Sequence, residues 1–343
     1  MQRLLITGGC GFIGTNFAQY FSDKGWEVTV LDNLSRKGSS ENLQWLQATY
    51  PKIRFVKADV RTDSPILEEE VIKHDVVFHL AAQVAVTTSV ANPREDFEIN
   101  VVGTLNLLEA IRTKKANPVL VFASTNKVYG GMEDVVIVPE GERYIYRDLP
   151  GGIPENRLLD FHSPYGCSKG TADQYVRDYA RIYGLKTVVF RQSCIYGPRQ
   201  YGIEDQGWIA WFTIASLMNR PITIYGDGKQ VRDVLHVADL ARAYELAVEK
   251  IDQVKGGVFN IGGGPNKALA VKEIFPMLEK FLGRKVPVTH GDWRPGDQPV
   301  YISNIEKAKQ ELGWEPNITP AEGVRTLFEW CKGHTTDFER LGF

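Results

Sequence analysis

Leu4-Leu5-Ile6-Thr7-Gly8-Gly9-Cys10-Gly11-Phe12-Ile13-Gly14 begins as a short apolar run, turns through glycines and enters an amphipathic segment. Glycines at positions 8, 11 and 14 suit a turn that brings a pyrophosphate to the amides of a helix N-terminus. Such a turn must be tight, and its helix must pack directly on the preceding strand. In a chain with 32 glycines this spacing alone is weak evidence, so the neighbouring sequence has to decide.

The end of the second expected strand, Val30-Leu31-Asp32, lies 18 residues beyond Gly14. An acidic side chain there can accept hydrogen bonds from both hydroxyls of an adenosine ribose, and it repels a 2′-phosphate. The pattern therefore predicts NAD as the cofactor. Two alternatives stay open: Asp32 as an ordinary turn residue at a strand end, and Arg36 as a partner for the phosphate of NADP.

Short apolar runs alternate with longer amphipathic segments through the first half of the chain. This alternation is typical of βαβ units, which build a parallel sheet with helices on both faces. We therefore expect a doubly wound α/β fold of the Rossmann type, with seven strands or a similar number. The strands that the sequence indicates cover residues 3–7, 27–31, 53–57, 75–80, 118–123 and 187–191.

The pattern changes beyond about residue 197, where segments become shorter and richer in Trp, Gly and Pro. We expect a dinucleotide-binding domain over residues 1–190 and a smaller C-terminal substrate-binding lobe over 191–343, interleaved with the last strands of the sheet. Residues 131–163 form a polar, Gly- and Pro-rich connection that is longer than a simple link requires. Loops of this kind often carry function.

The composition is that of an ordinary globular protein, with 43% hydrophobic and 24% charged residues. The formal net charge of -2 provides no overall field that would recruit nucleic acid or an anionic membrane. The cysteines have neither C-x-x-C spacing nor histidine partners, which argues against a metal site and a disulfide framework; they are Cys10, Cys167, Cys194 and Cys331. With no targeting segment or long apolar run, we expect a cytoplasmic, soluble protein.

The G-x-x-G-x-x-G spacing resembles that of the extended short-chain dehydrogenases, and further matches extend over nearly the whole chain. They are Asp59-Val60, His79-Leu80-Ala81-Ala82, Asn100, Ser124-Thr125, Tyr165 with Lys169, Tyr196-Gly197-Pro198, Arg232-Asp233 and Arg294-Pro295-Gly296-Asp297. Within that family the chain is most similar to the CDP-paratose 2-epimerases, also called CDP-tyvelose 2-epimerases. The segments that carry this likeness are 32–38, 124–130, 160–170 and 205–208.

The resemblance implies a bound NAD, a nucleotide-diphosphate sugar as substrate, and assembly as a homodimer or homotetramer through helices at about 94–115 and 165–183. Carried over residue by residue, it also implies a set of cofactor contacts. These are Gly8, Gly11, Phe12, Ile13, Gly14, Asp32, Asn33, Ser35, Arg36, Asp59, Val60, Leu80, Ala81, Ala82, Gln83, Asn100, Ser124, Tyr165 and Lys169.

Three residues carry the expected chemistry: Thr125, Tyr165 and Lys169. Tyr165 and Lys169 are four residues apart on a predicted helix, so both project from one face. A tyrosine, with an ordinary pKa of about 10, works as a base near neutral pH only if its anion is stabilised, and a neighbouring ammonium can do that. Thr125 follows the fifth strand, at the edge where such sheets bind ligands. A solvated Tyr-Lys pair and a threonine that only caps the backbone are the plain alternatives.

Asn126 and Lys127 occupy positions where related sugar 4,6-dehydratases carry an acid and a base, Asp-Glu. An amide and an ammonium cannot do both tasks, which favours epimerisation over dehydration. The predicted substrate contacts are Thr125, Asn126, Lys127, His162, Arg232 and Arg294, with the two arginines as clamps on the diphosphate. A solvated Lys127 stays open, and His79 is expected to order a turn. Cys194 stands where the dehydratases place an asparagine that touches substrate, so that contact does not carry over.

The resemblance thus implies an epimerase that oxidises C2 of a CDP-sugar, CDP-paratose or CDP-tyvelose, and reduces it again on the other face. The same residues would serve a UDP-hexose 4-epimerase or another NAD-dependent nucleotide-sugar enzyme. A catalytically silent NAD-binding regulator is the alternative from a different class of protein.

Overall fold

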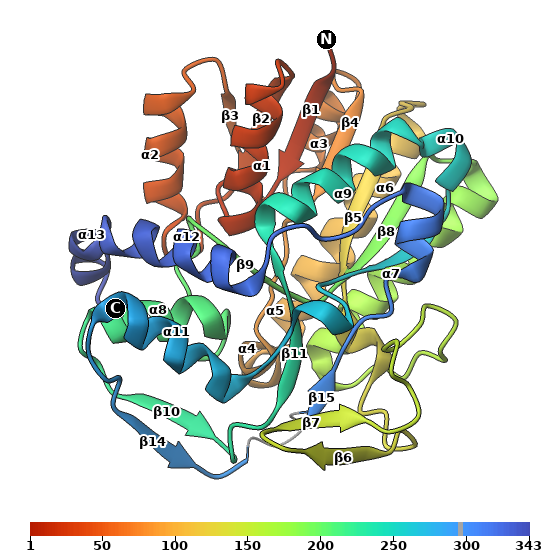
Figure 1. Ribbon diagram of the computed structural model, residues 1–343. Helices are drawn as coiled ribbons and strands as arrows, with labels where there is room; N and C mark the ends of the chain where they lie inside the picture. Colours follow the sequence, from red (N-terminus) through yellow and green to blue (C-terminus); the bar gives the residue numbers. More distant parts are fainter. Residues whose placement is uncertain (294–297) are drawn as a thin grey trace.

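A parallel sheet forms the centre of the protein, whose computed structural model describes residues 1–293 and 298–343 (Figure 1). Within those ranges seven strands belong to it, in the order β12-β8-β5-β4-β1-β2-β3. The strands are β1 (Arg3–Thr7), β2 (Glu27–Asp32), β3 (Arg54–Lys57), β4 (Val76–His79), β5 (Val119–Thr125), β8 (Thr187–Gln192) and β12 (Val258–Ile261). The predicted fold class is confirmed, and the C-terminal part of the chain supplies the last strand.

Strand β1 lies between β2 and β4, and this is the point where the strand order reverses. Thr7, the last residue of β1, pairs in register with Leu31 on one side and with His79 on the other. The connections from β1 and from β4 therefore leave on opposite faces of the sheet. In open α/β sheets this divergence leaves a crevice at the carboxyl ends of the strands, where ligands bind.

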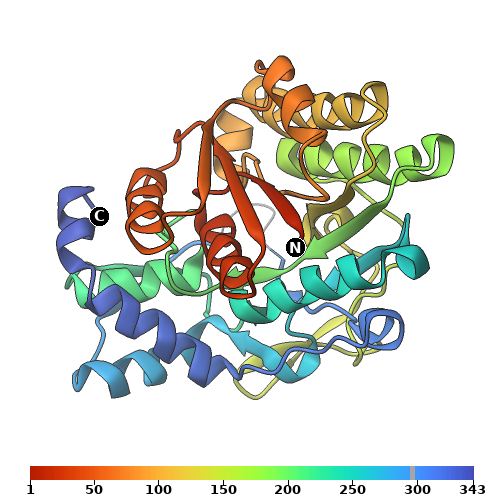
Figure 2. The same ribbon diagram turned by 90° about the horizontal axis from the view of Figure 1, so that it is seen from above.

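Helices cover both faces of the sheet, as the view from above shows (Figure 2). Side chains along a strand alternate between the faces, so Leu4 and Ile6 join one core cluster and Leu5 joins the other. The helices on the first face are α1 (Phe12–Asp23), α2 (Ser39–Thr49) and α9 (Val237–Glu249). Those on the second are α3 (Ser64–Val71), α6 (Gly103–Thr113) and α7 (Ser163–Tyr183).

The helix expected over 94–115 is composite. It consists of α5 (Pro93–Phe97), a π-helical turn over Glu98–Val102, and α6. Helix α7 covers the predicted span, with Pro164 in its first turn and Gly184 ending it at a φ of 73°. A π-turn inside a helix often marks a functional position, and this one contains Asn100.

The later part of the chain adds small sheets and helices around a second core cluster. One sheet contains β9 (Cys194–Tyr196), β11 (Val231–His236), β13 (Ala268–Ala270) and β15 (Val300–Tyr301); another pairs β10 (Ile222–Tyr225) with β14 (Val288–Gly291). Longer helices here are α8 (Trp208–Leu217), α11 (Ile274–Leu282), α12 (Pro320–Lys332) and α13 (Thr335–Arg340). Short helical turns elsewhere are α4 (Val86–Ala91), α10 (Ile251–Val254), Asn126–Tyr129, Pro265–Lys267, Val271–Glu273 and the π-turn Ala308–Leu312.

The connection 131–163 contains a hairpin that the sequence did not indicate. Its strands are β6 (Ile137–Glu140) and β7 (Arg143–Tyr146), joined through Gly141 at a φ of 56°. The Tyr146 hydroxyl donates to the carbonyl of Val300 at 2.8 Å. Each strand has only four residues, too few to give a periodic signal, and contacts with the C-terminal part of the chain hold the hairpin.

No helix in the described part of the chain combines the length and the apolar character needed to cross a bilayer. All four cysteines are free thiols, with Cys10 and Cys331 buried, Cys194 half-buried and Cys167 exposed.

Candidate active site

The glycine turn joins β1 to α1 at the carboxyl edge of the sheet. Gly8 has a φ of 69°, and a Cβ there would lie 2.7 Å from the amide nitrogen of Ala81. A Cβ on Gly14 would collide with the backbone of Gly8 and Gly9. A Cβ on Gly11 would approach only the Gly8 carbonyl, at 3.2 Å, so the N-terminus of α1 stays open toward the crevice. These glycines fit the three requirements of a phosphate-binding turn.

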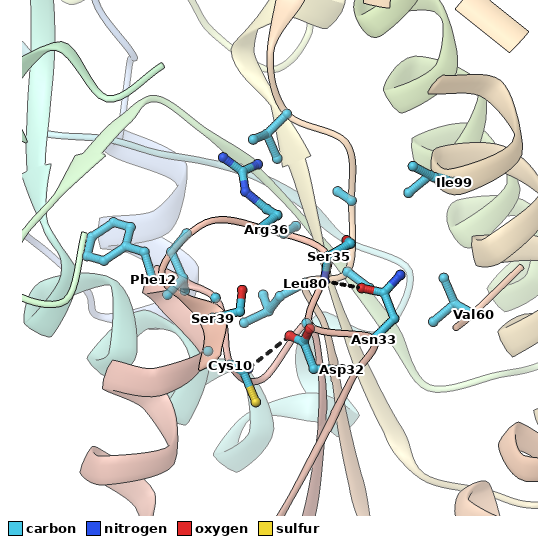
Figure 3. Close-up of a pocket in the computed structure, with 18 of the residues that line it drawn as sticks. Cys10, Phe12, Asp32, Asn33, Ser35, Arg36, Ser39, Val60, Leu80 and Ile99 are labelled. Carbon is cyan, nitrogen blue, oxygen red and sulfur yellow. Dashed lines mark hydrogen bonds between the residues drawn. The ribbon is translucent and has the colours of Figure 1, made fainter. Parts of the chain in front are cut away.

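A cavity of about 230 Å³ extends from this turn along the strand ends (Figure 3). Every residue predicted for the cofactor lines it except Gln83 and Asn100. The lining includes Asp32 and Asn33 at the end of β2, and Tyr165 and Lys169 on α7. The structure therefore brings together the glycine turn and the Tyr165–Lys169 pair, which are far apart in the chain.

Asp32 ends β2 with its carboxylate held in place by the backbone. Its Oδ2 accepts from the Cys10 amide at 3.0 Å, as Figure 3 shows, and its Oδ1 accepts from the Leu34 amide at 2.8 Å. Burial raises the pKa of Asp32, while these backbone hydrogen bonds and the charge of Arg36 lower it. A carboxylate has about four acceptor positions, so two remain for the hydroxyls of a ribose.

Gln83 and Asn100 lie behind the cavity wall and bond to each other. The Gln83 amide donates to Asn100 Oδ1 at 3.0 Å, and Asn100 Nδ2 donates to the Gln83 carbonyl at 3.1 Å. Asn100 Nδ2 also lies within hydrogen-bond reach of Ser168 Oγ, at 3.0 Å, next to Lys169 on α7. Neither residue lines the cavity, and these hydrogen bonds fix the turn after β4 against α7; a direct contact of either residue with the cofactor stays a prediction.

Tyr165 and Lys169 project from the first turns of α7 into the same cavity, as the spacing predicted. Lys169 is 3% exposed, and its Nζ lies 4.2 Å from the centre of the Phe122 ring. Burial lowers the pKa of Lys169 to about 7, against the opposing charges of Asp173 and Asp96, which raise it. A lysine with this pKa changes its charge near neutral pH.

Burial raises the pKa of Tyr165, and the charge of Asp96 raises it further. A hydrogen bond with the Thr125 side chain and the charge of Arg36 lower it. Thr125 and Arg36 therefore favour the phenolate in the structure, and the same role for the Lys169 ammonium stays a prediction. Thr125 is thus placed next to the candidate base.

Thr125 also caps the helical turn that begins at Asn126, as the plain alternative had it. Its Oγ1 accepts from the Lys127 amide at 3.2 Å and donates to Asn126 Oδ1 at 3.3 Å. Lys127 Nζ donates to Gln298 Oε1 at 3.3 Å, so this lysine is tethered to the C-terminal part of the chain. Thr125 can both cap this turn and bond to Tyr165, because a hydroxyl has one donor and two acceptor positions.

The predicted substrate residues that the structure describes do not line the cofactor cavity; they are Thr125, Asn126, Lys127, His162 and Arg232. Burial raises the pKa of the Cys194 thiol, and the charges of Arg232 and Lys127 lower it, so these three side chains gather on one side. His162 is exposed, immediately before α7. Arg294 lies outside the described residues.

His79 orders the sheet edge, as the sequence suggested. Its ring nitrogens lie 2.7 Å from Thr7 Oγ1 and 3.0 Å from Thr104 Oγ1, and burial lowers its pKa to about 3. The imidazole is therefore neutral and its two nitrogens are occupied by threonine hydroxyls.

Several cavity residues were missed by the sequence reasoning: Lys37, Gln192, Arg199, Gln200, Tyr201 and Gln206. Arg36 Nη2 donates to Gln206 Oε1 at 2.8 Å, which links the loop after β2 to the segment before α8. Gly38 has a φ of 86°, and any Cβ there would collide with the Tyr201 ring. The segments 32–38 and 205–208 both carry the sequence likeness to the CDP-paratose 2-epimerases. That shared likeness was the only sequence signal that the two segments meet in the fold.

A family model described as GDP-mannose 4,6 dehydratase matches residues 5–327, most of the chain. The protein belongs to this family of extended short-chain dehydrogenases. Among individual relatives, the CDP-paratose 2-epimerase of Salmonella typhi is 46% identical to this chain over 336 residues. The aligned residues cover 96% of this chain and 99% of the relative.

Two solved family members share the fold over nearly their whole length. The UDP-glucose 4-epimerase of Thermus thermophilus, in complex with NAD, has a TM-score of 0.80 and 33% identity, covering 96% of this chain and 99% of that one. DesIV, a dTDP-glucose 4,6-dehydratase from Streptomyces venezuelae with NAD bound, has a TM-score of 0.83 and 30% identity, covering 99% of both chains. Epimerases and dehydratases thus share one scaffold, and the site residues must separate them.

Proposed function

We propose that this protein is an NAD-dependent epimerase that inverts C2 of a CDP-linked sugar, interconverting CDP-paratose and CDP-tyvelose. One observation carries the proposal: Tyr165 and Lys169 line the cavity that begins at the glycine turn, Thr125 bonds to Tyr165, and Asn126 and Lys127 follow where dehydration needs an acid and a base. The 46% identity to the CDP-paratose 2-epimerase of Salmonella typhi supports both the choice of sugar and the choice of CDP as its nucleotide.

The residues of the cavity fit NAD. The glycine turn presents the N-terminus of α1 to a pyrophosphate, and Asp32 retains acceptor positions for a ribose and would repel a 2′-phosphate. We assign the predicted lining residues to NAD, and Gln83 and Asn100 to the support of that site. When bound, NAD supplies a reversible acceptor for the hydride of the sugar carbon.

In the proposed reaction Tyr165 takes the proton of the C2 hydroxyl while Thr125 holds the same oxygen. Loss of that proton and of the C2 hydride leaves a 2-keto sugar. After the keto sugar has turned in the cleft, the hydride returns to the other face of C2, and Tyr165 gives its proton back to the oxygen. Lys169, one helical turn from Tyr165, holds the nicotinamide ribose. No atom is gained or lost over the cycle.

Asn126 and Lys127 support epimerisation over dehydration. Elimination of a C6 hydroxyl needs an acid for the leaving oxygen and a base for the C5 proton. The Asn126 amide accepts from Thr125 and does not titrate, and the Lys127 ammonium donates to Gln298. Neither group can accept a proton in these roles.

We place the substrate between residues 191–343 and the sheet edge, with 1–190 as the NAD domain. Arg232 and Arg294 are proposed to grip the diphosphate, with Lys127 and His162 nearer the sugar. For the assembly we propose a homodimer or homotetramer through α6 and α7, supported by the exposed side chains of Tyr175, Ile182 and Tyr183 on α7. Sedimentation equilibrium measures that assembly directly.

CDP-paratose deuterated at C2 tests the proposed function. We expect CDP-tyvelose that keeps the label at C2, because the hydride returns from the bound cofactor, with an isotope effect on turnover. NMR and mass spectrometry of the product follow the label in unlabelled water.

The same sugar deuterated at C4 is the matched control and should turn over at the normal rate. An isotope effect confined to C4, with turnover of UDP-glucose, would establish the 4-epimerase alternative. Wash-out of the C2 label into solvent would replace hydride transfer by deprotonation next to a carbonyl.

A further inference from the structure

The wall of the cofactor cavity contains residues from two distant segments of the chain. Lys37, from the loop after β2, and Arg199 and Tyr201, from the segment before α8, line the same cavity. Gly38 has a φ of 86° and packs directly against the Tyr201 ring, which leaves no room for a Cβ. The two segments therefore form one wall only while they stay in contact.

Two amide side chains hold the backbone of the second segment. Asn42 Nδ2, on α2, donates to the Arg199 carbonyl at 3.3 Å, and Asn16 Nδ2, on α1, donates to the Pro198 carbonyl at 2.8 Å. Arg199 has a φ of 67°, in the left-handed region that residues other than glycine seldom adopt. Its guanidinium carbon Cζ lies 3.7 Å from the centre of the Trp45 ring, so the side chain of Arg199 also packs on α2.

Tyr201 is supported by aromatic side chains from the last helices. Its ring centre lies 5.4 Å from that of Trp330 on α12, 5.6 Å from that of Phe338 on α13 and 6.1 Å from that of Phe343. Phe338 and Phe343 are 0% and 2% exposed, and their ring centres are 5.5 Å apart. Aromatic pairs at such separations stabilise a fold beyond the area that they bury. The position of Tyr201 therefore depends on this cluster.

Two cations join the aromatic cluster to the loop after β2 and to α2. Lys37 Nζ lies 4.2 Å from the centre of the Phe343 ring. The Arg199 guanidinium, which is stacked on Trp45, is also 5.9 Å from the centre of the Trp330 ring. The negative face of an aromatic ring attracts a cation in this position. The two cations therefore resist separation of α2 from α12 and of residue 37 from Phe343.

Helix α13 lies beside α2, as both views of the fold show (Figure 1, Figure 2). Arg340 Nη2, on α13, donates to Glu41 Oε1, on α2, at 3.4 Å. We call the whole set of contacts the clasp. Its residues are Lys37, Gly38, Trp45, Arg199, Tyr201, Trp330, Phe338 and Phe343.

We propose that the clasp keeps NAD in its cavity between turnovers, with Phe343 as the positioning residue that supports both Lys37 and Tyr201. The proposal rests on the proposed function: an epimerase that returns its hydride in each turnover regenerates NAD and has no need to exchange it. Phe343 does not line the cavity, so it acts on the cofactor only through the two cavity residues that its ring contacts. Parting residues 36–38 from 199–201 exposes rings that the clasp buries, which slows the release of NAD.

The exchange of bound NAD tests the clasp. Purified protein loaded with NAD is mixed with an excess of isotopically labelled NAD, and mass spectrometry follows the replacement of the bound cofactor. Phe343→Ala removes ring pairs and one contact between a cation and a ring, so exchange should become about 10- to 100-fold faster. On dilution into buffer without NAD, this variant should lose activity toward CDP-paratose faster than wild type and regain it when NAD is added.

Phe275→Ala is the matched control for Phe343→Ala. It deletes a buried ring of the same core cluster that stacks on Phe212, with ring centres 5.3 Å apart, and takes no part in the clasp. Its NAD should exchange at the wild-type rate, while thermal unfolding compares the stability that the two variants lose. Phe343→Leu, which keeps an apolar side chain, should exchange NAD more slowly than Phe343→Ala. Trp45→Leu removes the ring on which Arg199 stacks, and it should also speed exchange.

Equal acceleration by Phe275→Ala and Phe343→Ala would overturn the proposal, because exchange would then follow overall stability. Wild-type exchange in Phe343→Ala overturns it as well. If Phe343→Ala does not fold, Trp45→Leu decides, since the Trp45 side chain is only partly buried, and wild-type exchange there has the same meaning. If the wild type turns over no nucleotide sugar while Phe343→Ala still speeds NAD exchange, the proposed function fails and the clasp stands.

Discussion

The region that we assign to NAD, called here the cofactor half, and the region that we assign to the sugar, called the substrate half, are built in different ways. In the cofactor half, Gly8 and Leu80 directly follow β1 and β4 and Asp32 ends β2, and the register of β1 with β2 and β4 places them side by side. In the substrate half, Cys194 and Arg232 come from β9 and β11, and Gln298 precedes β15. A parallel sheet collects its strand ends at one edge without further help, whereas the substrate half depends on contacts between distant segments.

Tyr165 lies where the cofactor half meets the substrate half, and Tyr165→Phe should have the largest effect on turnover. The variant lacks the hydroxyl that takes the sugar proton, so turnover should fall by roughly 10² to 10⁴. The rest of the cavity is unchanged, so the protein should still carry NAD after purification. The measurements are kcat with CDP-paratose and the NAD released on denaturation.

Tyr50→Phe is the control, because it makes the same change at a half-buried side chain that neither lines the cavity nor belongs to the proposed interface. Full activity in Tyr165→Phe would remove Tyr165 as the base. Loss of NAD from that variant would instead assign the tyrosine to the cofactor half alone.

The success of the sequence-based predictions follows the same division. The strands of the sheet, Asp32, and the Tyr165–Lys169 pair depend on local periodicity and on fixed spacing along one element, so they could be predicted. Arg199–Tyr201 and Gln206 could not be placed, because they reach the cavity only through long-range packing, as when the Tyr201 ring covers Gly38. The β6–β7 hairpin and the hydrogen bonds between Gln83 and Asn100 likewise depend on contacts that no local pattern encodes.

Asp32→Asn isolates the cofactor half and should have an intermediate effect. An amide keeps one acceptor for the backbone but loses the charge that holds the ribose hydroxyls. A hydrogen bond to a charged group contributes about 1.5–3 kcal/mol, so NAD should bind about 10- to 100-fold more weakly. Calorimetric titration of stripped protein with NAD measures this, and KM for the sugar at saturating NAD should be unchanged.

Asp23→Asn, at the exposed end of α1, is the matched control for Asp32→Asn. Unchanged NAD affinity in Asp32→Asn would reduce Asp32 to a turn residue. A gain in affinity for NADP without loss of NAD would point to Arg36 as the residue that selects the ribose.

Lys127→Met isolates the substrate half and should have the smallest effect. Lys127 is partly exposed and already donates to Gln298, so a further bond to substrate contributes about 0.5–1.5 kcal/mol, or two- to tenfold in KM for the sugar. NAD affinity should not change, since Lys127 does not line the cofactor cavity. Steady-state kinetics with CDP-paratose measure the effect, with the exposed Lys52→Met as control.

Lys127→Glu sharpens the comparison. It supplies a carboxylate at one of the two dehydratase positions, yet Asn126 still cannot titrate, so no dehydrated product should form. Dehydration by Lys127→Glu would show that one residue separates the two reactions, and an unchanged KM in Lys127→Met would make Lys127 a structural tether to Gln298.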